Sequence, residues 1–257
     1  MTSIPNKGRL FRDRWLVGAA LAGVIALCWG WIAPMALDMY GPMTGCSVWM
    51  MTRNWDFTHQ ALLFAMWGVM MIGMMLPSAA PAVFMYDSVV RRNTSHERVL
   101  PRVFAFAAGY LVVWIIFSLM ATALQLWLTK AALLSPMMEL RSRWFGGGLV
   151  LIAGLYQFTP WKRKCLRCCR CPADCNGSFQ SGLRNGLSCL GCCWALMLLL
   201  FVGGVMNLWW LSVLTIFVAL EKLTGRWIQG ARLSGVLLLA AGVWILRSVP
   251  WAIPGFR

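Results

Sequence analysis

The stretch from Val103 to Leu128 reads VFAFAAGYLVVWIIFSLMATALQLWL, and its 26 residues include no Asp, Glu, Lys, Arg or His. A helix needs roughly 20 apolar residues to cross the hydrocarbon core of a bilayer, so this stretch is long enough to span it. Six further apolar stretches lie on either side. Together the predicted spans cover residues 15–36, 60–84, 103–128, 144–159, 187–205, 208–221 and 232–250. The sequence therefore predicts an all-α, polytopic helical membrane protein with about seven transmembrane helices.

The composition also indicates a membrane protein. Of the 257 residues, 60% are hydrophobic and 12% are charged, and the mean hydropathy is +0.68. Soluble domains are about 45–50% apolar and about 25% charged. We expect a basic tail over 1–14, a single transmembrane domain over 15–250 and a short C-terminal tail over 251–257.

The net charge of +15 fits either a nucleic-acid partner or a membrane orientation signal, so the positions of the basic residues decide between them. Seventeen of the 23 basic residues lie in the N-terminal tail and in alternate connections between spans: Lys7, Arg9, Arg12 and Arg14; Arg91, Arg92, Arg98 and Arg102; Lys162, Arg163, Lys164, Arg167, Arg170 and Arg184; Lys222, Arg226 and Arg232. Cytoplasmic connections carry an excess of Lys and Arg. This pattern predicts a cytoplasmic N-terminus and an external C-terminus, and it gives no support to nucleic-acid binding.

Eight of the ten cysteines fall between Cys165 and Cys193, in two groups. The first group lies in the connection 160–186, which we expect to be a solvated, cysteine-rich cytoplasmic loop; its members are Cys165, Cys168, Cys169, Cys171 and Cys175. The cytoplasm keeps thiols reduced, and neighbouring arginines lower thiol pKa values. The spacing predicts a soft-metal site, with a redox-active dithiol as the alternative.

The second group lies in the first turns of the fifth predicted span. Cys189, Cys192 and Cys193 have the i, i+3, i+4 spacing that shares one helix face, and Met197 lies one turn beyond Cys193. Sulfur ligands favour Cu(I), Zn(II) or iron–sulfur clusters over hard cations. The alternative is that small cysteines simply pack in the membrane beside Gly191.

Methionines form a third pattern, because Met66, Met70 and Met74 follow one another at i, i+4 and i+8 in the second span. Thioethers bind Cu(I) without losing a proton, which suits an oxidising outer face. We interpret the row as a metal path leading inward, while packing by a flexible side chain is the alternative. Pro77 and Pro81 should break or kink the same span, exposing carbonyls to an ion or leaving them to neighbours.

Cys28 and Cys46 stand apart from the other thiols, near the outer end of the first span and in the connection that follows. An oxidising environment there permits a disulfide between them. The sequence leaves both a bridge and separate roles open, because their separation is unknown.

The segments Met74–Pro81 (MMLPSAAP) and Gly186–Met197 (GLSCLGCCWALM) resemble a bacterial family of uncharacterised integral membrane proteins predicted to bind metal. The resemblance runs from about residue 60 to 245. It implies that Cys189, Cys192 and Cys193 are metal thiols and that the protein lies in the bacterial cytoplasmic membrane, surrounded by lipid.

The sequence thus favours a membrane protein that binds a soft metal, Cu(I) before Zn(II), and acts in transfer, transport or metalloprotein assembly. A metallochaperone or a metalloenzyme is the expected partner. No hydrolase or phosphate-binding motif is present, so a non-enzymatic role is favoured. The alternative is a membrane thiol–disulfide oxidoreductase or redox sensor.

Overall fold

The computed structural model describes residues 7–40, 56–93, 98–134, 140, 142–170, 177–223 and 228–247. In these residues the regular structure is helical, apart from an isolated bridge between Leu134 and Leu140. The helices are α1 (Lys7–Tyr40), α3 (Phe57–Asn93), α4 (Val99–Lys130), α5 (Arg143–Gln157), α6 (Pro160–Arg170), α7 (Ser178–Leu198), α8 (Leu200–Gly203), α9 (Leu208–Leu223) and α10 (Ile228–Arg247). The predicted all-α class is confirmed for this part of the chain.

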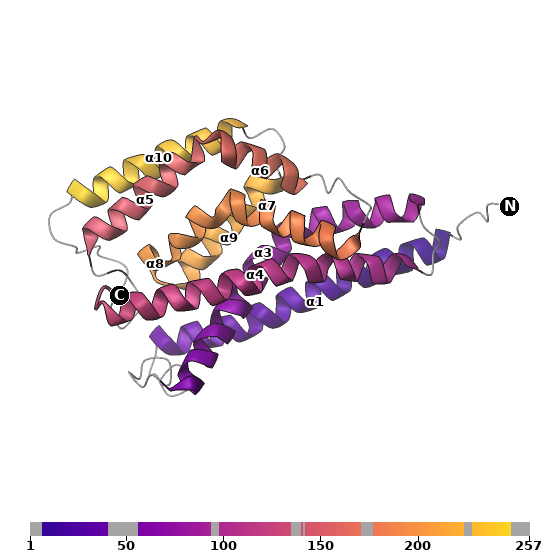
Figure 1. Ribbon diagram of the computed structural model, residues 1–257, viewed down its shortest axis with the longest axis horizontal. Coiled ribbons are helices and arrows are strands. Elements are labelled where there is room, and N and C mark those ends of the chain that lie inside the picture. Colours follow the sequence, from indigo (N-terminus) through magenta and orange to yellow (C-terminus); the bar gives the residue numbers. More distant parts are fainter. Residues whose placement is uncertain are drawn as a thin grey trace.

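The helices pack as a bundle whose middle is α7. Helix α7 lies along α4, α4 along α3, and α3 along α1, while α6 packs on α7 and α9 on α3 (Figure 1). Helices α5 and α10 lie side by side at the edge opposite α1 (Figure 1). Most of the buried apolar residues belong to one cluster centred on α3, α4, α7 and α9.

Among the described residues, four helices are long and apolar enough to cross a membrane, namely Arg12–Met39, Phe57–Arg92, Val99–Lys130 and Ser178–Gly203. The other three predicted spans also coincide with helices, α5, α9 and α10. Helix α9, with 16 residues, is about 24 Å long at a rise of about 1.5 Å per residue, short of the roughly 30 Å hydrocarbon core. Seven spans and their orientation therefore stay a prediction.

The expected loop over 160–186 is largely helical, so that prediction was wrong for most of its residues. Residues Pro160–Arg170 form α6, and the segment from Ser178 onward already belongs to α7. Proline is favoured at a first helical position, and the following Lys, Arg and Leu residues are good helix formers. Closely spaced cysteines and basic residues are equally typical of a solvated loop, and for that reason they did not predict this helix.

Two prolines bend α3 without breaking it. The helix is continuous over 37 residues that include Pro77 and Pro81, and it changes direction between its first and last turns (Figure 1). Pro77 has no N–H for the Gly73 carbonyl, which instead accepts a hydrogen bond from Trp29 Nε1 on α1 at 3.3 Å. A side chain on α1 therefore satisfies the carbonyl that Pro77 leaves without a donor.

Glycines bring α4 and α7 into close contact. A Cβ atom at Gly182 would lie 2.0 Å from the Phe106 carbonyl oxygen, and one at Gly109 would lie 2.2 Å from the Phe179 carbonyl oxygen. Small residues at such positions let helix backbones approach in a membrane, where van der Waals packing drives association. This contact sets the depth and rotation of α7, which carries the second cysteine group.

We expect Gly182→Ala to destabilise the fold by about 1–3 kcal/mol, because the added methyl group overpacks a backbone contact. The measurement is the unfolding midpoint of the purified protein in detergent micelles. Gly68→Ala on α3 is the matched control, since a Cβ atom there meets nothing within 4 Å. Equal midpoints for the two variants would contradict the role of the α4–α7 contact.

Candidate metal centre

The sulfur of Cys189 on α7 is the point where three helices meet. It is fully buried, and it lies 2.7 Å from Lys222 Nζ on α9 and 3.0 Å from the Tyr110 hydroxyl on α4. An ammonium donates hydrogen bonds only, so the sulfur accepts from Lys222. Charge-assisted hydrogen bonds of this kind are stronger than neutral ones.

Helix α3 completes the surroundings of Lys222. Ser78 Oγ lies 2.8 Å from Lys222 Nζ and donates its own proton to the Met75 carbonyl oxygen at 2.8 Å. The Tyr110 hydroxyl lies 3.3 Å from the same carbonyl oxygen. Lys222 is therefore held between α3 and α7, and its position does not depend on Cys189 alone.

Cys192 and Cys193 lie on the same buried face of α7 as Cys189, as their spacing predicted. Their thiols donate to the Cys189 carbonyl oxygen at 3.0 and 2.9 Å. Met197 is also buried one turn further on. The second cysteine group thus places three thiols and a thioether in the interior of the bundle.

Helix α6 brings a thiol of the first cysteine group to this centre. Cys169 is buried, and its thiol interacts with the thiols of Cys189 and Cys192. Cys165 is half-buried and packs on α7 at Gly191, where an added Cβ would lie 2.8 Å from the Cys165 sulfur. Cys168 faces solvent. One helix therefore carries thiols at three depths, from the surface to the centre.

The lowered thiol pKa values expected from the neighbouring arginines are not found at Cys165 and Cys169. Hydrogen bonds to Cys189 and Cys192, together with burial, raise the pKa of the Cys169 thiol well above its usual value. Burial also raises the pKa of the Cys165 thiol. Desolvation outweighs the basic side chains, because burial disfavours the charged thiolate.

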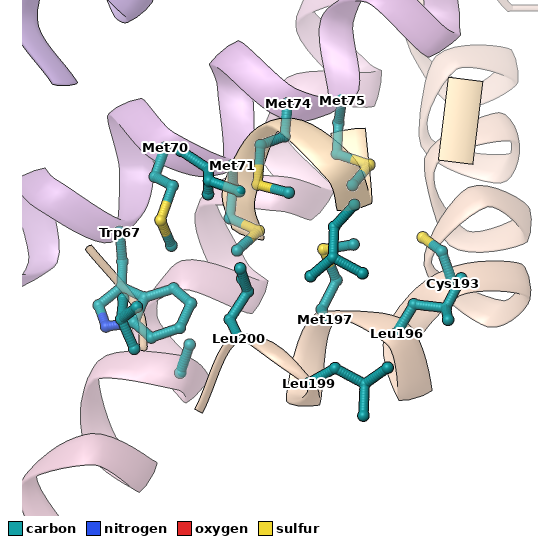
Figure 2. Packing of buried hydrophobic residues seen from close by; sticks show 14 of the residues in the cluster. Trp67, Met70, Met71, Met74, Met75, Cys193, Leu196, Met197, Leu199 and Leu200 are labelled. Carbon is teal, nitrogen blue, oxygen red and sulfur yellow. The ribbon is translucent and has the colours of Figure 1, made fainter. Parts of the chain in front are cut away.

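The methionine row faces the same interior. Met66, Met70 and Met74 are all buried on α3. Figure 2 shows the side chains of Met70, Met71, Met74 and Met75 projecting from α3 into the interior that also holds Leu200 and Met197, with Cys193 on the other side of Met197. Thioethers thus fill the space between α3 and the thiols.

Of the remaining cysteines, the structure describes Cys28 alone. Cys171, Cys175 and Cys46 lie outside the described residues. Cys28 is a free, buried thiol on α1, so the alternative of a separate role holds for it.

In the described ranges, no group of three or more His, Cys, Asp or Glu side chains is arranged to hold a metal ion. The thiols instead contact one another, a backbone carbonyl, Tyr110 and Lys222. A pair of sulfurs, or a set that includes thioethers, still offers the soft donors that Cu(I) prefers. For three thiols to bind one metal ion, at least one cysteine side chain must rotate from its present position.

The predicted surroundings of two lysines were wrong. Lys162 and Lys222 were counted among solvated basic residues of the connections, whereas both are buried in the bundle. Lys162 Nζ lies 2.7 Å from Glu221 Oε1 and also donates to Gln157. A signal was available for Lys222, because it directly follows the predicted span 208–221 and continues the same helical segment, where an ionisable residue is a functional candidate.

In the described residues, the fold and the site define an all-helical protein with apolar helices long enough to cross a membrane and a buried centre of thiols and thioethers. A family of copper chaperones, PpoB2, matches residues 64–245, and the chain belongs to this family. The match includes both Met74–Pro81 and Cys189–Met197, so copper handling is the shared property of the family and this chain. No curated protein and no solved structure matches it.

We expect alkylation of Cys189 to be more than about tenfold slower than alkylation of Cys168, because a buried thiol reacts only after local opening. The measurement is differential alkylation of the reduced, folded protein, followed by peptide mapping. Protein alkylated after denaturation supplies the control, in which both residues should react alike. Similar rates in the folded protein would mean that the centre is open to solvent.

Proposed function

We propose that the protein is a copper chaperone of the bacterial cytoplasmic membrane that binds Cu(I) at the Cys189 centre and transfers it to or from a partner. The single observation that carries this is the convergence of Cys189, Cys192 and Cys169 in the buried interior of the bundle. Sulfur donors and shielding from water both favour Cu(I) over harder ions. Zn(II) is the second choice.

The proposed topology has seven spans, a cytoplasmic N-terminus and an external C-terminus. Positive charge in alternate connections supports it. In this orientation α6 lies at the cytoplasmic face, where thiols stay reduced.

The thiols of α6 are proposed to carry copper between solvent and the centre. Cys168 is exposed and Cys169 is buried against Cys189, so a metal ion taken up at the surface has sulfur ligands on the way in. Cys171 and Cys175 are proposed to join this route. The buried thioethers of Met66, Met70, Met74 and Met197 are proposed to extend it toward the outer face.

The partner is proposed to be a metallochaperone or a metalloenzyme that receives copper during its assembly. Transfer between sulfur ligands needs neither nucleotide nor an ion gradient.

The second candidate function is a thiol–disulfide oxidoreductase or redox sensor, and the exposure of Cys168 is the observation that favours it. The burial of Cys189 argues against it, because exchange requires direct attack of a thiolate on a disulfide. Unchanged metal content together with loss of thioredoxin- or quinone-linked turnover in the cysteine variants would favour this candidate.

We expect Cys189→Ser to weaken Cu(I) binding by at least about tenfold, since even outer partners of a metal site contribute about 10–100-fold. The measurement is competition with a chromophoric Cu(I) chelator, using anaerobically purified protein. Cys28→Ser is the matched control, because it also removes a buried thiol but from α1, where Cys28 packs at Gly73 of α3. Equal affinities for the two variants would overturn the proposed site.

We expect Cys169→Ser to slow Cu(I) loading from a soluble donor complex while leaving the final copper content near that of the unaltered protein. The reason is that Cys169 supplies a step in transfer, whereas Cys189 and Cys192 hold the ion. Stopped-flow loss of the donor's absorbance measures the rate, again with Cys28→Ser as control. An unchanged rate would remove α6 from the route.

A further inference from the structure

A cation is an unexpected neighbour for a metal ligand, yet Lys222 Nζ lies 2.7 Å from Cys189 Sγ. An ammonium in an apolar interior is unfavourable unless an anion neutralises it. The ionisable groups that act on Lys222 include the thiols of Cys189, Cys169 and Cys192. The contact therefore pairs a buried positive charge with the sulfur group that binds metal in the proposed function.

The contact between Lys222 and Cys189 can neutralise the charge of a bound copper complex. A Cu(I) ion held by two thiolates forms a complex with one net negative charge. Such a charge is costly to bury in a medium of low dielectric constant. The single charges of copper and Lys222 together balance the two thiolates.

We propose that Lys222 is the counter-cation of a Cu(I) ion bound between Cys189 and Cys192, and that it makes the site select a monovalent soft ion over a divalent one. This inference rests on the proposed function. A Zn(II) ion on the same pair of thiolates, with Lys222 beside it, leaves one positive charge unbalanced. Neutrality then requires a third thiolate, which Cys169 is placed to supply.

The surroundings of Lys222 allow it to stay while the metal binds. Ser78 Oγ holds Nζ at 2.8 Å from the side of α3, and Ser78 is itself fixed to the Met75 carbonyl oxygen. The sulfur of Cys189 has further lone pairs for the metal. Lys222 is thus a positioning and specificity-determining residue and not a ligand.

The binding step balances without an oxidant or a reductant. When copper arrives on a single carrier thiolate, the Cys189 thiolate that is paired with the Lys222 ammonium forms a bond to copper, and the bond from the carrier sulfur to copper breaks as a bond from the Cys192 sulfur forms. The Cys192 thiol proton passes to the released carrier thiolate. Copper remains Cu(I) throughout.

The test compares Cu(I) and Zn(II) affinities of the full-length protein, purified anaerobically in detergent, by competition with chromophoric chelators. Lys222→Met, which keeps the length of the side chain and removes its charge, should weaken Cu(I) binding at least about tenfold, as expected when one partner of a buried charge pair is lost. Zn(II) binding should be unchanged or tighter. Lys222→Arg, which keeps the charge, should retain the preference for Cu(I).

A purely structural role for Lys222 would weaken both metals equally in Lys222→Met, and that outcome overturns the inference. So does an unchanged preference for Cu(I). The unfolding midpoint of each variant, measured beside the affinities, shows whether the bundle is intact.

Cys169→Ser decides the question independently of whether the Lys222 variants fold. Since only the divalent ion needs the third thiolate, this variant should lose Zn(II) affinity at least about tenfold more than Cu(I) affinity. Equal losses for the two metals overturn the inference.

The failure of the inference is distinguishable from the failure of the proposed function. If the unaltered protein binds no Cu(I), or if Cys189→Ser binds it normally, the proposed function fails. If Cu(I) binding depends on Cys189 but the preference for Cu(I) over Zn(II) is the same with and without the charge at Lys222, only the counter-cation role fails.

Discussion

The contact between Lys222 and Cys189 places demands on the whole bundle, because a charged pair is stable in an apolar interior only with close geometry and further hydrogen bonds. Its two atoms come from α9 and α7 and lie 2.7 Å apart. Ser78 on α3 and Tyr110 on α4 supply the additional partners. Four helices must therefore hold their relative depth and rotation for the pair to persist.

Features remote from the centre maintain that arrangement. The close approach at Gly109 and Gly182 fixes α7 against α4, and therefore fixes Cys189 relative to Tyr110. The bend in α3 follows from Pro77, and Trp29 on α1 satisfies the carbonyl of Gly73 that the proline leaves without its donor. The backbone polar groups of a bent membrane helix need such partners, since lipid offers none. The bend and the glycine contact thus contribute to one site although neither touches sulfur.

Much of the fold was predictable, because span length and the absence of charge are local properties of the chain. Each predicted span coincides with a helix, and the i, i+3, i+4 rule correctly placed Cys189, Cys192 and Cys193 on one buried face. Helix α6 was missed because its cysteines and basic residues are equally typical of a solvated loop. Helix α6 is amphipathic, and its apolar side is buried only by packing on α7. The sequence of the segment does not show that packing.

The buried charges around the site, Lys162 and Lys222, were not predictable in the same way. Counting basic residues by segment assigns Lys162 and Lys222 to solvent, since both follow the apolar stretches closely. Their burial depends on partners far away in the sequence, Glu221 for one and Cys189 with Ser78 for the other. Such pairing is a tertiary property that a single sequence does not reveal.

The neighbouring positions Glu221 and Lys222 connect α6 to the thiol centre. Successive helical residues point about 100° apart, so α9 presents one charge toward α6 and the other toward α7. Glu221 holds Lys162 on α6 at 2.7 Å, and breaking a buried ion pair by moving one partner away costs about 3–5 kcal/mol. Displacement of α6 as a whole is therefore unfavourable. Copper exchange between Cys169 and Cys189 is expected to occur through side-chain rotation within a fixed helix pair, which keeps the ion on sulfur and away from water throughout the transfer.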